Sequence, residues 1–304
     1  MIDNPGIYKI SMEEYKADPC IEPSLSRSII KTLLFESPAQ AKYDHPRLKD
    51  YEEIEDEEIE DVKKFDIGTA AHSLILEGKD IIEIIDPQDF PGAKGGIPKG
   101  FTTAEMKKER DRVRTQGKIP LLPKQNQRVQ RMVLAAEKQI ALCPELGIKN
   151  LRAEGESELT YIWKEGNTWL KTRPDWKSKD RKTTIDYKTT ATSADPAQFT
   201  RRLIDGGYDI QESLYRRGGK AIDEVNTKYV FVVQETRPPY LCSFISLPPQ
   251  WQEIGKQKVD YGIFLWEQCM ASGIWPGYPN QVCYPDCPPW AMSQWELIAE
   301  RIGL

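Results

Sequence analysis

Residues 173–190, RPDWKSKDRKTTIDYKTT, decide the fold of this chain of 304 residues. The second half of this stretch, 182–190, has the β-branched residues and the alternation that are typical of a β-strand. Residues two apart in a strand point to the same side, so Asp186 and Lys188 should project together. An adjacent strand can bring Asp175 beside Asp186. The stretch therefore predicts two carboxylates and a lysine gathered on one sheet.

This combination of side chains indicates a metal-dependent reaction. Clustered carboxylates repel one another unless a cation neutralises them, and their hard oxygen atoms suit Mg²⁺ or Mn²⁺. A lysine beside such a site can orient a water molecule or stabilise charge that develops on a phosphate. A single D-x-K pattern is common in proteins, so the functional inference depends on the order in which the motifs follow one another. Glu158 precedes them, and a helix with Gln211 and Tyr215 four residues apart on one face follows them.

In this order, the motifs resemble those of the PD-(D/E)XK nuclease superfamily, and more closely those of the exodeoxyribonuclease VIII (RecE-type) nucleases of phages and prophages. The similarity extends over about residues 20–235 and is carried by five segments: RPDW (173–176), IDYKTT (185–190), GYDIQESLYR (207–216), LSRSIIKTLLFESPAQAKYD (25–44) and IGTAAHSLILEG (67–78). The resemblance implies a restriction-endonuclease-like α+β fold, with a central mixed β-sheet flanked by helices and a helical N-terminal section.

The resemblance also implies roles for individual residues. Lys188 would be the catalytic lysine, acting with the carboxylates of Asp175, Asp186 and Glu158. The ligands of Mg²⁺, for which Mn²⁺ can substitute, would be Asp175, Asp186, Glu158, His72 and the main-chain carbonyl of Tyr187. Residues expected to border the site or the DNA are Gln211, Tyr215, Arg173 and Thr189.

The activity implied by the resemblance is that of a Mg²⁺-dependent DNA exonuclease. It would hydrolyse duplex ends, in the 5′-to-3′ direction, and leave a single strand for a phage-type annealing protein. A homo-oligomer that encloses the DNA is also implied. Two alternatives remain open: a related endonuclease, flap or single-strand nuclease, and a DNA-binding module whose site is silent. The intact set of three carboxylates and Lys188 disfavours the silent module.

The charge distribution reconciles an acidic chain with a DNA partner. The formal net charge is −5, but the segment 50–61, DYEEIEDEEIED, alone carries nine carboxylates, and the chain without it would be +4. We expect this acidic segment to lie away from the DNA path. Candidate phosphate contacts are Lys107 and Arg110, within the basic segment 106–118, and Arg201 beside Arg202. Ordinary solvated helix faces explain these basic residues equally well.

Four cysteines gather in the last quarter of the sequence and raise the alternative of an iron–sulfur cluster or a zinc site: Cys242, Cys269, Cys283 and Cys287. Their spacing lacks the usual C-x₂-C pitch, so reduced structural thiols are favoured. Three tryptophans of the same region are expected to be packing residues: Trp275, Trp290 and Trp295.

The organisation along the chain predicts three parts. These are a helical section over 1–150 that packs on the core, a nuclease core over 151–272, and an irregular tail over 273–304 that is rich in Cys, Trp and Pro. Helices are expected over 24–34, 62–78, 124–142, 194–207, 208–219 and 249–271. Strands are expected over 155–163, 167–176, 182–190, 228–235 and 240–247. No apolar run approaches the roughly 20 residues of a membrane span, and the first residues lack the layout of a signal peptide. We therefore expect a cytoplasmic protein, and the resemblance implies that the cell is bacterial or phage-infected.

Overall fold

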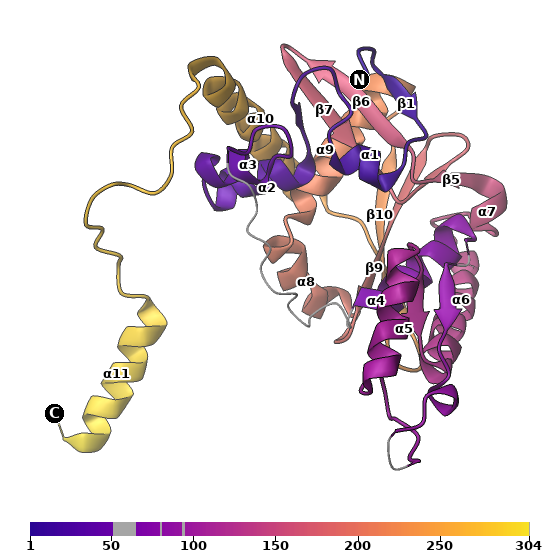
Figure 1. Ribbon diagram of the computed structural model, residues 1–304. Coiled ribbons are helices and arrows are strands. Elements are labelled where there is room, and N and C mark those ends of the chain that lie inside the picture. The colour runs from indigo at the N-terminus through magenta and orange to yellow at the C-terminus, as the bar shows by residue number, and fades with distance from the viewer. Residues whose placement is uncertain (51–64, 80, 93–94, 304) are drawn as a thin grey trace.

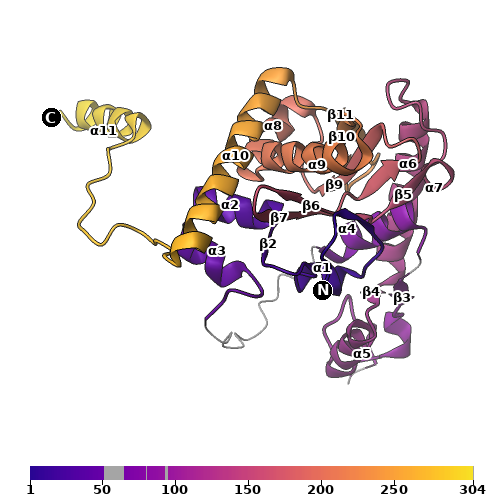
Figure 2. The same cartoon turned by 90° about the horizontal axis from the view of Figure 1, so that it is seen from above.

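The computed structural model describes residues 1–50, 65–79, 81–92 and 95–303. Two β-sheets form the body of the molecule, and helices cover them (Figures 1 and 2). Of the acidic segment 50–61, only Asp50 belongs to the described residues, so the expected position of this segment relative to DNA is not tested. Among the described helices, none is both long enough and apolar enough to span a membrane.

The larger sheet has five strands in the order β11-β10-β9-β8-β5. Its strands are β5 (Gly155–Ser157), β8 (Trp176–Ser178), β9 (Thr183–Thr190), β10 (Lys228–Glu235) and β11 (Cys242–Ile245). Strands β9 and β10 are parallel, with Asp186 opposite Phe231, and the other neighbours are antiparallel. Helices α8 (Pro196–Asp205) and α9 (Tyr208–Asp223) form the crossover that a parallel pair requires. The sheet is therefore mixed, as expected.

Apolar side chains cover both faces of this sheet. On strand β10, Val230 and Val232 face a core that is shared with α4 (Phe65–His72) and α6 (Pro123–Leu142). The alternate residue Phe231 joins a second core with Phe199 and Leu203 of α8. Because successive strand residues point to opposite faces, β9 and β10 are buried on both sides, which is typical of parallel strands.

The smaller sheet combines strands from both sides of the boundary predicted at residue 150. Its order is β1-β6-β7-β2, with β1 (Gly6–Tyr8), β2 (Ser24–Leu25), β6 (Thr160–Glu165) and β7 (Thr168–Thr172). Lys171 of β7 donates to the buried carboxylate of Asp18 at 3.2 Å, and Arg47 and His45 lie 3.4 Å from the same carboxylate. The N-terminal section thus supplies two strands and a buried ion-pair network to the body.

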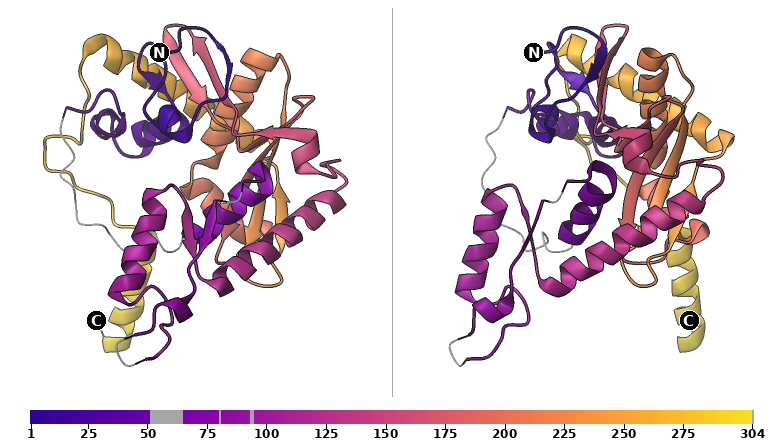
Figure 3. Two further views of the ribbon diagram at one scale, coloured as in Figure 1. Left: turned by 45° about the vertical axis from the view of Figure 1, so that its right-hand side comes forward. Right: turned by 90° about the vertical axis from the view of Figure 1, so that its right-hand side faces the viewer.

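The remaining elements lie around these two sheets. The other helices are α1 (Met12–Lys16), α2 (Arg27–Phe35), α3 (Pro38–Asp44), α5 (Ala104–Thr115), α7 (Leu151–Glu154), α10 (Pro249–Ser272) and α11 (Pro289–Ile302). A π-helical turn (Ser73–Glu77) follows α4, and a 3₁₀ turn (Pro87–Asp89) follows β3 (Ile82–Ile84), which pairs in parallel with β4 (Ile119–Leu121). Figure 3 shows α5 at the end of the molecule opposite β1.

Helix α9 links the two sheets. It packs against β6 and β7 of the smaller sheet and against β10 of the larger one. We predicted that it ends at the pair Gly218-Gly219, and this was wrong, because the helix continues to Asp223. A Cβ at Gly218 would lie 2.9 Å from the Trp163 ring, and one at Gly219 would lie 2.8 Å from Lys177 Nζ. The glycines therefore permit close packing of the helix instead of ending it.

The tail also differs from its prediction as irregular. Residues 289–302 form α11, which follows an extended segment and stands apart from the body in Figure 1. Trp275 packs edge-on against Trp266, with 5.5 Å between ring centroids, as expected for a packing residue. Trp290 and Trp295 are 70% and 57% exposed, so their prediction as packing residues was wrong. They lie on α11, which buries none of its residues.

The first prediction concerns Glu212, a buried carboxyl group on α9. Its Oε2 atom has no hydrogen-bond partner within the described part of the chain, Arg216 lies 3.3 Å from its Oε1, and burial raises its pKa to about 7. The folded protein therefore binds more protons than the unfolded chain between pH 4.5 and 7, and its stability falls as the pH rises through this window. Glu212→Gln imitates the neutral carboxyl, so it should stabilise the fold more at pH 8 than at pH 5, by about 2 kcal/mol.

Denaturant unfolding of both proteins at the two pH values measures this difference. Glu253→Gln, at an exposed position of α10, is the matched control and should change stability equally at both pH values. An equal effect of Glu212→Gln at pH 5 and pH 8 would contradict the assignment of a raised pKa to this carboxyl.

Candidate functional site

Strands β8 and β9 place two acidic residues side by side. Trp176 pairs with Ile185 in an antiparallel ladder, so Asp175 and Asp186 come next to each other at the end of β8. The main-chain N–H of Tyr187 donates to Asp175 Oδ2 at 2.8 Å. The predicted juxtaposition of the two carboxylates therefore follows from the strand register alone.

Asp186 lies at the centre of a group that faces helix α9, which we call the inner group: Asp186, Lys188 and Gln211. The Asp186 side chain is 1% exposed, forms an ion pair with Lys188 Nζ, and accepts a hydrogen bond from Gln211 Nε2. Gln211 also donates to the Tyr229 hydroxyl at 3.2 Å. Lys188 and Gln211 thus both lie against the carboxylate of Asp186.

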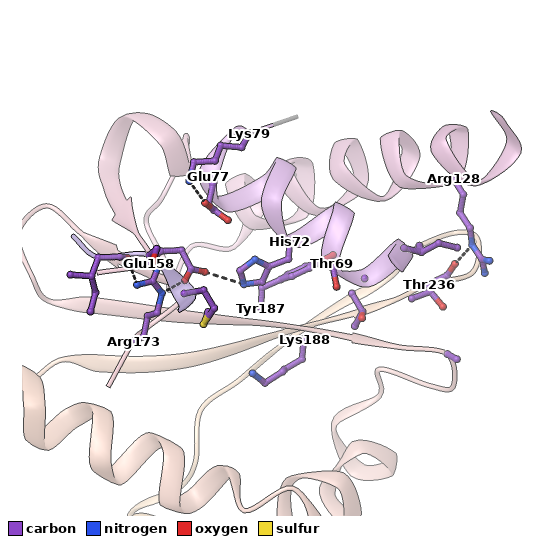
Figure 4. A pocket seen from close by; sticks show the side chains of 17 residues that line it. Thr69, His72, Glu77, Lys79, Arg128, Glu158, Arg173, Tyr187, Lys188 and Thr236 are labelled. Carbon is purple, nitrogen blue, oxygen red and sulfur yellow. Dashed lines mark hydrogen bonds and ion pairs between the residues drawn. The ribbon is translucent and has the colours of Figure 1, made fainter. Parts of the chain in front are cut away.

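His72 approaches Asp175 from the other side of strand β9, at the end of α4. Figure 4 shows His72 and Lys188 on opposite sides of this strand. His72 Nε2 lies 3.3 Å from Asp175 Oδ2 and 3.7 Å from Glu158 Oε1. The helix can come this close because Gly68 faces Thr189, where a Cβ would lie only 2.7 Å from the threonine hydroxyl.

Glu158 lies between strands β5 and β6 in an unusual backbone conformation. Its φ of 58° is in the left-handed region, which non-glycine residues adopt rarely and mostly at sites where the surroundings hold them. Here the Glu158 N–H donates to the carbonyl of Asp175 at 3.2 Å, and Arg173 Nε donates to Glu158 Oε2 at 2.6 Å. Arg173 also donates to the carbonyl of Ile10 at 2.8 Å. This arrangement turns the Glu158 carboxylate toward His72.

The electrostatics show a site with several competing carboxylates. Burial raises the pKa of Asp186, and the neighbouring Asp175 raises it further. Burial alone would also raise the pKa of Asp175, but Lys188 and His72 hold it below its usual value. Burial would lower the pKa of His72, but its hydrogen bond with Asp175 and the charges of Asp175 and Glu158 raise it to about 9. Protonated side chains thus balance the carboxylates of the free protein.

The residues present fit a divalent cation. Asp186 Oδ1 is buried and lacks a hydrogen bond of normal geometry among the described residues, and the Lys188 ammonium forms an ion pair with it. Three other side chains place one ligand atom each within 4.8 Å of one another: His72, Glu77 and Glu158. Carboxylate oxygens with one imidazole nitrogen suit Mg²⁺ or Mn²⁺. Glu77 belongs to no sequence-predicted set.

A cavity of about 1020 Å³ opens beside these groups. Its lining includes His72, Glu158 and Lys188, together with the basic residues Lys79 and Arg128 (Figure 4). Arg128 projects from α6 and donates to the carbonyl of Thr236. The sequence analysis missed all three of Glu77, Lys79 and Arg128. Glu77 lies within the segment 67–78 that carries part of the resemblance, but no role was assigned to it, and Lys79 and Arg128 lie outside the five segments.

Other predicted residues lie away from this cavity or are paired elsewhere. Tyr215 packs edge-on against Tyr229 in the core, with 5.9 Å between ring centroids. Arg110 is ion-paired with Asp111, Lys107 is exposed on α5, and the Arg201 side chain is 90% exposed. The four C-terminal cysteines are free thiols, and in the described ranges no three of them lie close enough to share an ion.

Comparison with known proteins places the fold. A candidate exonuclease from Eubacterium rectale aligns with a TM-score of 0.56 and 12% identity, over 94% of this chain and 98% of that chain. This likeness concerns the fold alone. SSO0001 aligns over 72% of this chain and 98% of that chain, at 13% identity, but its TM-score of 0.26 supports no conclusion. No curated protein matches the chain.

A family match covers most of the sequence. The family described as PDDEXK-like domain of unknown function (DUF3799) matches residues 26–286. This range includes both sheets apart from β1 and β2, and all of the acidic residues, His72 and Lys188 of the site. The prediction of a PD-(D/E)XK protein with a restriction-endonuclease-like α+β fold is confirmed. The chain therefore belongs to the PDDEXK-like family DUF3799.

Proposed function

We propose that this protein is a divalent-metal-dependent DNA nuclease that hydrolyses duplex ends as an exonuclease. The observation that carries the proposal is the placement of Asp175 and Asp186 side by side, with Lys188 against Asp186, beside a cavity that Lys79 and Arg128 also line. A phosphodiester is an anion that gains charge as it is cleaved, so it requires cationic partners in its transition state. This cavity supplies them next to the acidic residues.

Each residue of the site would have a separate role in such a hydrolysis. Asp175 and Asp186 would hold a cation of the Mg²⁺ or Mn²⁺ type, and the carbonyl of Tyr187 is a further candidate ligand. When bound, this cation would lower the pKa of a water molecule and neutralise phosphate charge. Burial would lower the pKa of Lys188, but Asp186 and Asp175 raise it, so Lys188 remains an ammonium. Its role is therefore to stabilise developing negative charge, and Gln211 orients the Asp186 carboxylate.

Three finer parts of the proposal rest on the family resemblance. These are the 5′-to-3′ direction, a single-strand annealing protein as the partner in recombination, and a homo-oligomer that encloses DNA.

The basic helix α5 was our candidate for phosphate contacts. Arg112 pairs with Glu109 at 2.7 Å and Arg114 pairs with Asp66 at 3.1 Å, whereas Lys107 and Lys108 are exposed. The two lysines are therefore better candidates for phosphate contacts than the arginines.

The substrate preference can be tested with two DNA forms of the same sequence. One is a linear duplex with a fluorophore on one 5′ end, and the other is a covalently closed circle. With Mg²⁺, we expect early release of short labelled products from the linear duplex and no cleavage of the circle. Nicking of the circle would identify an endonuclease. A label that stays on progressively shorter strands would reverse the proposed direction.

The next prediction concerns Asp186→Asn. This change keeps the shape and the contact with Gln211 but removes the negative charge that would hold the cation, so cleavage should fall by several orders of magnitude. The unfolding temperature should hold or rise slightly, because burial and Asp175 both disfavour the ionised Asp186. Parallel cleavage and thermal-unfolding measurements check both parts. Near-normal turnover by the folded variant would remove Asp186 from the active site.

A separate prediction concerns Lys188→Ala. Lys188 is proposed to act in the transition state, so the variant should bind Mn²⁺ at least as well as the parent protein while its cleavage rate falls by about 10²–10³-fold. Lys188→Arg should restore little, because a planar guanidinium does not reproduce a compact ammonium. Lys182→Ala, at an exposed lysine just before β9, is the matched control and should retain activity. A loss of metal binding together with activity would make Lys188 a structural support.

A further inference from the structure

The helix that carries His72 changes its geometry immediately after this residue. Helix α4 ends at His72 and passes into the π-helical turn Ser73–Glu77, which ends at Gly78 with a φ of 65°. In a regular α-helix, residues five apart lie about 140° apart around the axis and cannot converge. A π-turn closes its hydrogen bonds between residues five apart, and such turns occur frequently at functional sites. His72 and Glu77 are five apart and come to one face.

The π-turn is held in place by side chains from elsewhere in the chain. Arg152 donates to the carbonyl of Leu74 at 2.8 Å, and Ser157 donates to the carbonyl of Leu76 at 2.5 Å. Ser73 donates its own hydroxyl to the carbonyl of Lys79 at 3.1 Å. Each bond gives a partner to a carbonyl in or just after the turn. The irregular turn is thus supported by α7 and β5.

The consequence is a second set of ligand atoms, which we call the outer group: His72, Glu77 and Glu158. One ligand atom from each lies within 4.8 Å of the others, and all three residues line the cavity. Figure 4 shows them together on the side of β9 that faces away from Lys188. The inner group lies on the α9 side of this strand. Asp175 lies between the groups, since it contacts His72 and accepts from the Tyr187 N–H.

The Lys79 ammonium, which pairs with Glu77 in the free protein, is easily displaced. Lys79 Nζ lies 2.7 Å from Glu77 Oε2, but its side chain is 68% exposed, so the pair contributes little to stability. The Glu77 side chain itself is 19% exposed and points into the cavity. A lysine that can turn into water leaves the carboxylate available to a stronger cation.

We propose that Glu77 is a ligand of a second divalent cation, which it shares with His72 and Glu158. The proposal rests on the proposed function in one respect: two cations, one in each group, could bind the same phosphodiester from two sides, as two-metal hydrolases do. The metal set predicted from the sequence thereby divides in two. Asp186 serves the inner site, His72 and Glu158 serve the outer site, and Asp175 adjoins both.

The test is a calorimetric titration of the full-length protein with Mn²⁺ in the absence of DNA. The parent protein should bind two ions. Glu77→Gln should lose one of them, or bind it at least about tenfold more weakly, while the other ion is retained. Asp186→Asn should show the opposite pattern. An isotherm of Glu77→Gln that equals that of the parent protein would overturn the proposal.

Two control variants separate ligation from indirect effects. Lys79→Met removes the competing ammonium, so it should leave the outer site unchanged or tighten it. If Lys79→Met weakened binding as much as Glu77→Gln, Glu77 would act only through its ion pair, and the proposal would be wrong. Glu137→Gln, at a partly exposed carboxylate of α6 that pairs with Arg152 at 3.4 Å, should bind both ions normally.

The readout distinguishes this proposal from the proposed function. Loss of one Mn²⁺ in Glu77→Gln supports the outer site even if the parent protein cleaves no DNA. Unchanged binding in Glu77→Gln overturns the outer site even if the parent protein is an active nuclease.

Discussion

Two carboxylates that are buried side by side require a cation to neutralise them, and the arrangement of residues around β9 meets this requirement. Asp186 is almost completely buried beside Asp175, and burial and the neighbouring carboxylate both raise the pKa of Asp186. Lys188 and His72 supply positive charge from opposite sides of the strand. In the free protein, the cationic side chains of Lys188 and His72 thus lie where a bound metal ion could neutralise the same carboxylates.

Glycines set how closely the helices approach this centre. Gly68 lets α4 reach Thr189, and Gly218 lets α9 contact Trp163 of the smaller sheet. Gly255 of α10 lies against the main chain of Asp209, where a Cβ would be 2.4 Å from the carbonyl oxygen. The same helix α9 carries Gln211 to Asp186, so the packing of both sheets on α9 determines the position of this carboxylate.

The parts of this arrangement that depend on local periodicity could be predicted from the sequence. Strand alternation placed Asp186 with Lys188. Glu77 could not be found in this way, because the α-helical period directs it away from His72 and only the π-turn reverses this. The Gly218-Gly219 pair was misread for a similar reason, since their value lies in contacts with distant residues. Whether α5 contacts DNA depends on ion pairs such as Arg114–Asp66, which also join distant segments.

The parallel pairing of β9 with β10 has a consequence for the order in which the protein is made. Asp186 follows His72 by 114 positions, and β9 gains its parallel partner only when the chain has reached Glu235. Such non-local pairings form late in folding, because the intervening loop must be closed first. The N-terminal residues leave the ribosome first. A partly synthesised chain therefore contains the His72 helix before it contains Asp175 and Asp186, and the complete acidic centre exists only after the chain has reached Glu235.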